Sequence, residues 1–311
     1  MSSRPTLTGI GSLPAVDGPL DEALTAAVEL QRAVGFGLLT DGEPRGDMLS
    51  LYASFPGIEM RSGVPRVVGR IRPLDDPASF AKVRDLDFLR AAFPDASFKV
   101  TLTAPTTFLL ACAASGAGPA YRGALDPVLH DDLTEALRPI AREIGRRGAR
   151  LQLDDPILSQ GMRDYGPGLR RLDAIAGELP RDRVDLHVCG GLAKSKTLDA
   201  LRRLRNVSTL NLAFAGRSER ENLALLDRAF LEDRDLDLGA GCIDVQVTGP
   251  AEVMPPESVA DLLREISSRV GPDRVRYVLP DCGLRATPRE AVPRLLENLA
   301  KGFALAFPDA A

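Results

Sequence analysis

Apolar residues follow two different periodicities along this chain, and the two kinds of segment alternate. Short β-branched and aliphatic runs are separated by longer segments whose apolar positions recur three and four residues apart, as in Leu24, Ala27 and Val28. The short runs, each predicted to be a strand, are Leu7–Ile10, Gly37–Thr40, Phe98–Thr103, Arg150–Asp154, Val184–Val188, Ser208–Phe214, Leu236–Val245 and Arg276–Leu279. The predicted helices include Asp21–Val34, Leu133–Arg146, Leu169–Leu179, Thr197–Leu204, Glu219–Phe230 and Pro256–Val270. Eight strands that alternate with helices predict an α/β fold, a (β/α)8 TIM barrel, as one domain over residues 1–311.

One part of the chain departs from this alternation. Residues 44–96 are rich in proline and glycine, and the stretch Val64–Ile71 within them predicts an inserted hairpin or lid between the second and third barrel strands. A doubly wound open sheet is the alternative fold. The pattern disfavours it, because Gly9–Pro14 lacks the third glycine and the following helix of a dinucleotide-binding loop.

Composition narrows the class of protein further. The net charge is −4 and the 39 basic residues are spread along the chain, which argues against a nucleic-acid or anionic-membrane partner. No apolar run is long enough to cross a membrane, and no signal-peptide core follows the N-terminus, so a cytoplasmic location is expected. Four cysteines in such a chain do not indicate a disulfide framework.

Polar residues gather directly after six of the predicted strands. These groups are Gly11–Pro14, Thr40–Glu43, Thr103–Thr106, Asp154–Pro156, His187–Gly191 and Pro280–Leu284. Aspartate, glycine and proline are ordinary turn and capping residues after any one strand. In a barrel, however, the carboxyl ends of all strands meet at one mouth, where active sites lie. Six such groups together therefore favour an active site over simple turns.

The histidine and two cysteines in these groups suggest a metal site. His187 and Cys189 are two residues apart on a predicted strand, so their side chains leave the same face. Cys282 follows the last strand and reaches the mouth from the other side. One imidazole and two thiolates suit Zn²⁺ with a fourth position left open for catalysis. Such an ion can hold a substrate thiol as the thiolate, or it can activate water for hydrolysis.

The ordered motifs resemble a known family. Gly11–Pro14, Asp41–Glu43 with Arg45 and Asp47–Met48, Gln152–Pro156, His187–Gly190 and Pro280–Leu284 resemble the C-terminal catalytic domain of cobalamin-independent methionine synthase. This resemblance implies a (β/α)8 barrel that uses zinc to methylate the homocysteine thiol. The chain looks like the short, single-barrel members of the family, since it lacks the N-terminal barrel that helps bind methyltetrahydrofolate. For those members the resemblance implies methylcobalamin, another methylated corrinoid, or a corrinoid protein partner as methyl donor.

The resemblance also assigns residues. His187, Cys189 and Cys282 match the zinc ligands, and Ser12 matches the position that contacts the carboxylate of the amino-acid substrate. Glu43 and Asp154 match the residues that hold its ammonium group, a role for which two carboxylates are suited.

The chain departs from the family pattern at several positions. Ala213 stands where a glutamate ligand is expected, and Asn211 on the same strand is a poor substitute. Gln246 replaces the histidine proposed as general acid, which fits a corrinoid donor but also fits an enzyme that has left methionine synthesis. Asp244 is then the remaining candidate for proton transfer, or else a turn carboxylate.

Three further residues lie outside this set of predicted roles. Asp155 is one methylene shorter than the usual glutamate, and Cys112 and His130 are interpreted as structural.

Three functions remain open at this point. The first is a zinc-dependent methyltransferase acting on homocysteine or a related small-molecule thiol. The second is a decarboxylase or carbon–sulfur transferase of the uroporphyrinogen-decarboxylase-like barrels, and the third is a non-catalytic barrel that binds zinc or a thiol. Metal content separates the first from a zinc-free decarboxylase, and a methyl-transfer assay separates an enzyme from a binding protein.

Overall fold

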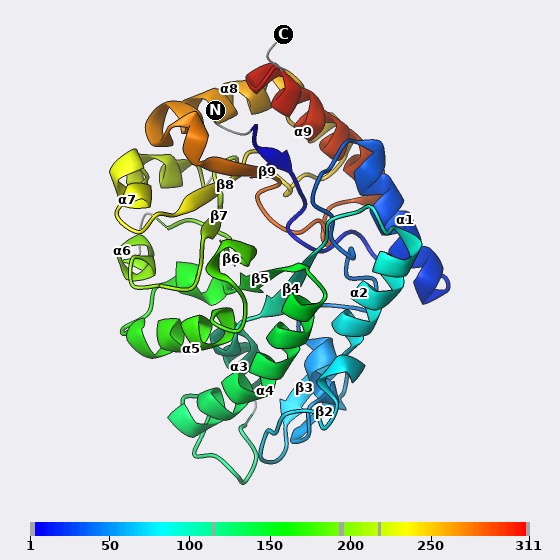
Figure 1. Cartoon of the computed structure of the whole chain (residues 1–311), viewed down its shortest axis with the longest axis vertical. Coiled ribbons are helices and arrows are strands. Elements are labelled where there is room, and N and C mark those ends of the chain that lie inside the picture. Colours follow the sequence, from blue (N-terminus) through cyan, green and yellow to red (C-terminus); the bar gives the residue numbers. More distant parts are fainter. Residues whose placement is uncertain (1–3, 114–115, 193–195, 217–218, 309–311) are drawn as a thin grey trace.

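The computed structural model describes residues 4–113, 116–192, 196–216 and 219–308. Its centre is a curled sheet in which neighbouring strands are parallel, in the order β1-β9-β8-β7-β6-β5-β4 (Figure 1). The strands are β1 (Thr6–Leu7), β4 (Lys99–Thr103), β5 (Arg150–Asp154), β6 (Val184–Val188), β7 (Thr209–Ala213), β8 (Asp237–Gly241) and β9 (Val275–Leu279). The expected α/β barrel class is confirmed.

The segment predicted as the second strand closes the barrel between β1 and β4. Leu38 forms a parallel bridge with Thr8, and Leu39 forms one with Phe98. The Leu39 N–H donates to the Ser97 carbonyl at 2.9 Å, and the Lys99 N–H donates to the Leu39 carbonyl at 2.8 Å. The segment is thus extended and paired on both sides, although it is too short for a continuous ladder. Together with the seven named strands it gives eight strand positions.

Helices surround this sheet on its outer face (Figure 1). They are α1 (Leu20–Ala33), α2 (Ala81–Ala92), α3 (Pro105–Ala113), α4 (Pro127–Arg146), α5 (Gly166–Ala176), α6 (Thr197–Leu201), α7 (Arg228–Glu232), α8 (Pro256–Val270) and α9 (Val292–Ala306). The pattern did not single out α2, α3 or α9. The prediction of one helix over Glu219–Phe230 is wrong: a 3-10 helix (Arg220–Leu225) precedes α7 there, because Asp227 is extended and caps α7 through the Phe230 N–H.

The predicted hairpin is present within residues 44–96. Strands β2 (Ile58–Arg61) and β3 (Val64–Val67) pair antiparallel, and β3 lies beside α3 (Figure 1). Tyr52 joins this insertion to the barrel, since its ring stacks on Phe108 at 4.6 Å and its hydroxyl donates to the Thr103 carbonyl at 2.6 Å. The predicted extent is corrected at one end: α2 is the regular barrel helix before β4, so the inserted part ends before Ala81.

Polar side chains occupy the inside of the barrel. Lys99, Gln152 and Asn211 are each at most 1% exposed. The Asn211 amide donates to Gln152 Oε1 at 2.9 Å, and Lys99 Nζ donates to the Gly9 carbonyl at 2.7 Å. These bonds satisfy groups that would otherwise be costly to bury, and they lie directly below the mouth.

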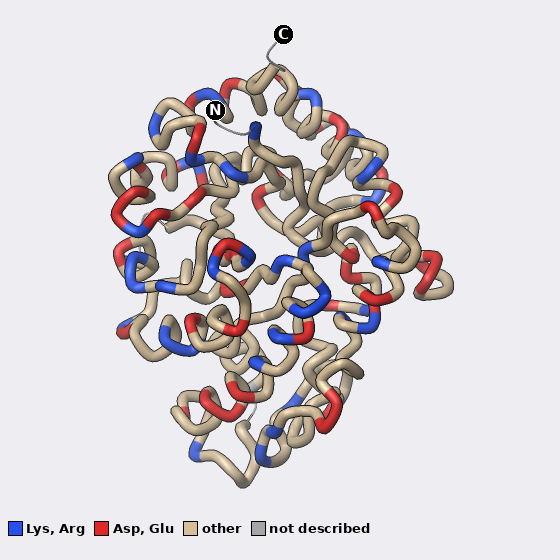
Figure 2. Tube along the Cα trace, in the orientation of Figure 1, with Lys and Arg blue, Asp and Glu red and all other residues tan. Residues whose placement is uncertain are grey.

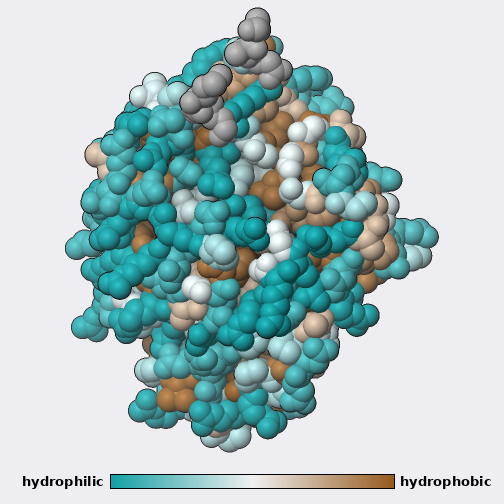
Figure 3. Space-filling view, in the orientation of Figure 1, coloured by the Kyte–Doolittle hydropathy of each residue, from teal (hydrophilic) through white to brown (hydrophobic). Residues whose placement is uncertain are grey.

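The outer surface carries mixed charge. Lysine and arginine alternate with aspartate and glutamate around the helices, and the face shown in Figure 3 is mainly hydrophilic (Figures 2 and 3). This distribution agrees with the spread of charge along the sequence. Among the described helices, none combines the length and the apolar character that a membrane crossing would need.

Candidate metal centre

Three predicted ligands come together at the mouth of the barrel. His187 lies on β6, Cys189 follows the same strand, and Cys282 follows β9. Their ligand atoms all lie within 4.8 Å of one another. The structure therefore brings into one place residues that are 95 positions apart in the chain, as the strand-end pattern predicted.

The His187 ring is oriented for metal binding. Its Nδ1 lies 3.1 Å from the Asn211 carbonyl, and because a carbonyl can only accept, Nδ1 carries the proton. This leaves Nε2 with a free lone pair. Nε2 is buried and has no hydrogen-bond partner among the described residues. A buried ring nitrogen of this kind, beside two thiols, fits a Zn²⁺ ligand whose other nitrogen is held by a backbone acceptor.

The two thiols share their protons unequally. A hydrogen bond with the Cys189 thiol lowers the pKa of Cys282 to about 4 against the opposing effect of burial. The same interaction raises the pKa of Cys189, and burial adds to it. A bound cation would lower the pKa of both thiols and favour both thiolates.

Two residues to which the sequence analysis assigned no role hold the loops that carry the cysteines. Asn222 donates to the carbonyls of Gly190 at 3.1 Å and Ala213 at 2.9 Å, and so ties the loop after Cys189 to the end of β7. Asp281, next to Cys282, accepts backbone N–H groups from the segment after β7, including Gly216 at 2.6 Å. Asp281 belonged to a quoted motif, but nothing in its spacing revealed this role. Asn222 gave no signal in the sequence.

The predicted substrate residues line the same cavity as the candidate zinc ligands. This cavity, of about 260 Å³, is lined by Ser12, Glu43 and Asp154 as well as by His187, Cys189 and Cys282. Burial raises the pKa of Asp154 to about 7, although its Oδ1 accepts from the Gln152 amide at 2.6 Å. A carboxylate that is costly to ionise alone is well suited to receive a substrate cation. Asp155 is fully buried, accepts from Thr107 at 2.6 Å and is not among the described lining residues.

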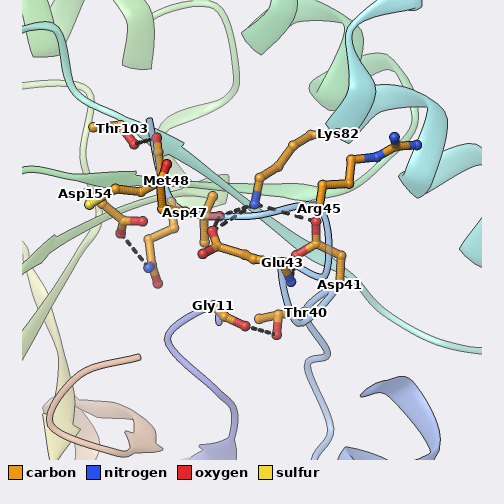
Figure 4. Close-up of polar contacts among 12 residues, drawn as sticks. Gly11, Thr40, Asp41, Glu43, Arg45, Asp47, Met48, Lys82, Thr103 and Asp154 are labelled. Carbon is orange, nitrogen blue, oxygen red and sulfur yellow. Dashed lines mark hydrogen bonds and ion pairs between the residues drawn. The ribbon is translucent and has the colours of Figure 1, made fainter. Parts of the chain in front are cut away.

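Glu43 is already paired with a buried lysine (Figure 4). Lys82 Nζ lies 2.8 Å from Glu43 Oε1 and 3.4 Å from Asp41 Oδ2. Thr101 also donates to Glu43 Oε1, at 2.6 Å. Burial alone would lower the pKa of Lys82, but the carboxylates of Asp41 and Glu43 raise it above its ordinary value, so Lys82 stays charged. Sequence analysis missed Lys82, because it lies on α2 within the segment predicted as a lid.

The positions at which the chain departs from the family pattern are also visible. Ala213 is buried at the end of β7. The backbone carbonyl of Asn211 accepts from His187, and its side-chain amide donates to Gln152. The strand predicted over Leu236–Val245 is wrong beyond Gly241, because the chain bends at Ile243 and Asp244 closes a turn by accepting from the Gln246 N–H at 2.8 Å. Asp244 is not among the described residues that line the cavity, and its catalytic role stays a prediction.

Cys112 and His130 lie away from the mouth, in α3 and α4. Both are buried, and His130 Nε2 contacts the Ala124 carbonyl at 2.8 Å.

Comparisons with known proteins place this geometry in context. The family model described as "Cobalamin-independent synthase, Catalytic domain" matches residues 129–302. A methionine synthase from Methanothermobacter thermautotrophicus is 32% identical over 289 residues, which cover 89% of this chain and 87% of that protein. One from Methanocaldococcus jannaschii is 26% identical over 307 residues, covering 96% and 94%.

A solved structure shares the fold. This chain resembles a B12-independent methionine synthase from Shewanella sp. W3-18-1 in complex with selenomethionine, with a TM-score of 0.78 and 20% identity over 97% of each chain. These comparisons do not support the corrinoid donor or the corrinoid protein partner expected from the sequence, because the matching family is described as independent of cobalamin.

Proposed function

Since the chain belongs to the cobalamin-independent synthase catalytic-domain family, we propose that it is a zinc-dependent methyltransferase that methylates the homocysteine thiol to form methionine. Membership of this family makes it a methyltransferase rather than a decarboxylase or a binding protein without activity. The observation that carries the zinc proposal is the unpartnered, buried His187 Nε2 beside two thiols, in the lining of a cavity that also contains the carboxylates of Glu43 and Asp154.

The residues of the chain divide the work along the substrate. His187, Cys189 and Cys282 would hold zinc, which when bound stabilises the substrate sulfur as a thiolate at neutral pH. Asp154, supported by Gln152, would accept the substrate ammonium together with Glu43. Ser12 would contact the substrate carboxylate. Because the substrate would be held at both ends, its sulfur would be placed for in-line attack on the donor methyl group.

The reaction balances without any oxidant. The substrate sulfur loses its proton and forms the new S–CH3 bond, while the donor leaves with the electron pair of the bond that breaks. The described residues of the cavity do not identify the methyl donor, so two donors are compared in the assay below. The cytoplasmic location and the absence of nucleic-acid or membrane partners stay predictions from the sequence.

Metal content is the first test of this proposal. Protein purified without chelator is expected to carry about one zinc per chain, because three protein ligands with one open position form a complete catalytic site. The variant Cys189→Ala is expected to lose most of it. Cys112→Ala is the matched control, because Cys112 is a buried thiol in α3, away from the cavity. A content below about 0.2 zinc per chain that does not change in Cys189→Ala would refute the zinc proposal.

Methionine formation from homocysteine is the second test. We expect product with 5-methyltetrahydrofolate or methylcobalamin as methyl source, dependent on added zinc after chelation and lost in Cys189→Ala but kept in Cys112→Ala. Running the two donors in parallel decides between them. Zinc-replete protein that forms no methionine with either donor would contradict the proposed reaction.

A further inference from the structure

Arg285 brings a positive charge into the cavity. It lies three residues after Cys282 and lines the same cavity as Ser12, Asp154 and the candidate zinc ligands. Its Nη2 donates to the backbone carbonyls of Glu43 and Gly46, both at 2.5 Å. Across residues 4–113, 116–192, 196–216 and 219–308, no acceptor bonds its Nε or Nη1 and no carboxylate forms an ion pair with it. Part of the guanidinium is therefore left to a ligand.

The charged side chains that line the cavity are divided unevenly between the two signs. Arg285 is the one lysine or arginine among the described lining residues, against the carboxylates of Glu43, Asp47 and Asp154. Lys82, the other nearby cation, is buried and forms ion pairs with Glu43 and Asp41. The carboxylates supply more than enough negative charge for one ammonium group. Among the described lining residues, Arg285 is thus the basic side chain that can offset the carboxylate of an entering zwitterion, in addition to the charge of a bound zinc ion.

Arg285 lies next to the residues expected to bind the two charged groups of an amino acid. Its guanidinium is held against the Glu43 carbonyl, so it lies beside the residue whose side chain faces the expected ammonium site. The preceding residue, Leu284, donates its N–H to the Ser12 carbonyl at 2.8 Å, which places Arg285 next to the residue expected to contact the carboxylate. In an α-amino acid the two charged groups are attached to one carbon, so their binding residues must be neighbours.

We propose that Arg285 binds the α-carboxylate of the substrate and makes the enzyme selective for amino-acid thiols over amine thiols that lack a carboxylate. This inference rests on the proposed function for the identity of the substrate. The selectivity follows because an amine thiol would leave the guanidinium without its anion inside the cavity. This role was not predictable from the motifs, because Arg285 lies one residue beyond Pro280–Leu284.

The test compares two ligands that differ only in the carboxylate and needs no turnover. Calorimetry measures the binding of L-methionine, the proposed product, and of 3-(methylthio)propylamine to the wild type and to Arg285→Gln. We expect Arg285→Gln to weaken methionine binding about 10- to 100-fold, the range for a hydrogen bond to a charged group. Binding of the amine should change less than about threefold. Arg285→Lys should recover part of the loss.

A matched control and the opposite outcomes complete the design. Arg289→Gln removes an exposed arginine four residues further along, outside the described lining of the cavity, and should change neither affinity. Equal losses for both ligands in Arg285→Gln would overturn the proposal, since they would mean that Arg285 acts only by holding the Glu43–Gly46 backbone. Unchanged methionine binding would overturn it too.

The binding experiment and the methyl-transfer assay can fail independently of each other. Protein that binds methionine through Arg285 but forms none would contradict the methyltransferase reaction and leave the carboxylate site standing. If product binding is too weak to measure in the wild type, the same comparison is made on kcat/KM for homocysteine and 3-aminopropanethiol. There, a loss confined to homocysteine supports the proposal and a shared loss overturns it.

Discussion

Single residues at the mouth of the barrel acquire their properties from partners far away in the sequence. His187 is ready to bind a metal because the Asn211 carbonyl holds its Nδ1, and Glu43 is partly neutralised because Lys82 reaches it from α2. The sequence motifs identified His187 and Glu43 but not Lys82, and they pointed to Asn211 only as a poor zinc ligand and not as the partner of His187. A carbonyl has no sequence signature, and a lysine on an amphipathic helix looks like any solvent-facing lysine.

Lys99 offers a prediction at this scale. It is buried inside the barrel, and burial lowers its pKa from the ordinary value of 10.5 to about 8. As the pH rises, Lys99 therefore loses its proton earlier in the folded protein than in the unfolded chain. Between these values the unfolded chain binds more protons, so stability rises with pH. The free energy of unfolding of the wild type, relative to Lys99→Met, should therefore increase by about 3 kcal/mol from pH 8 to pH 10.5.

Urea unfolding at several pH values in this range measures the difference. Lys301→Met is the control, because the Lys301 side chain is 62% exposed and its removal should leave the pH dependence parallel to that of the wild type. If the stability of Lys99→Met also runs parallel to that of the wild type over this pH range, folding does not lower the pKa of Lys99.

Among the secondary-structure elements, the regular strands were easy to predict and the irregular ones were not. The predicted bounds of β5 and β6 agree with the structure, because apolar and polar residues alternate along both strands with the two-residue period of a strand. β8 ends earlier than predicted, since Asp244 closes a turn that competes with strand pairing. The segment 44–96 was recognised as irregular, but α2 within it was not.

Tyr52 is expected to hold the inserted hairpin on the barrel. Tyr52→Ala removes a buried ring stacked on Phe108, at a cost of about 3 kcal/mol, and should release β2 and β3 locally. Limited trypsin digestion should then cleave after Arg61, which is exposed in the hairpin, about 10- to 100-fold faster than in the wild type.

Tyr52→Phe keeps the ring and loses only the hydrogen bond to the Thr103 carbonyl, so its cleavage rate should stay close to that of the wild type. An unchanged rate in Tyr52→Ala, or cleavage spread over the whole barrel, would show that the hairpin does not depend on this contact.

On the scale of the whole molecule, the candidate metal centre joins elements that are remote in the sheet. The ligands follow β6 and β9, which are separated by β7 and β8 in the strand order. An ion bound here would cross-link the two sides of the barrel in the folded state only. Binding to the folded state alone raises stability in proportion to the logarithm of ligand concentration over Kd.

Removal of zinc should therefore lower the thermal stability of the entire chain. We expect one cooperative unfolding transition, consistent with the single domain predicted over residues 1–311, whose Tm falls by about 5 °C or more after dialysis against a chelator. Adding zinc back should restore it. Cys189→Ala should not respond to either treatment, whereas Cys112→Ala should behave as the wild type does. Two separate transitions, or a Tm that is indifferent to zinc in the wild type, would contradict this expectation.

The sequence by itself determined the fold class, the three candidate zinc ligands and the side of the barrel on which they lie. It could do so because strand and helix periodicities are local, and because parallel strands in a barrel must end at one mouth. Only the tertiary structure decided which charges face one another. Lys82 meets Glu43, Arg285 turns into the cavity, and Asn222 and Asp281 hold the ligand loops through contacts between residues up to 67 positions apart. Such pairings depend on distance in space, which no periodicity along the chain records.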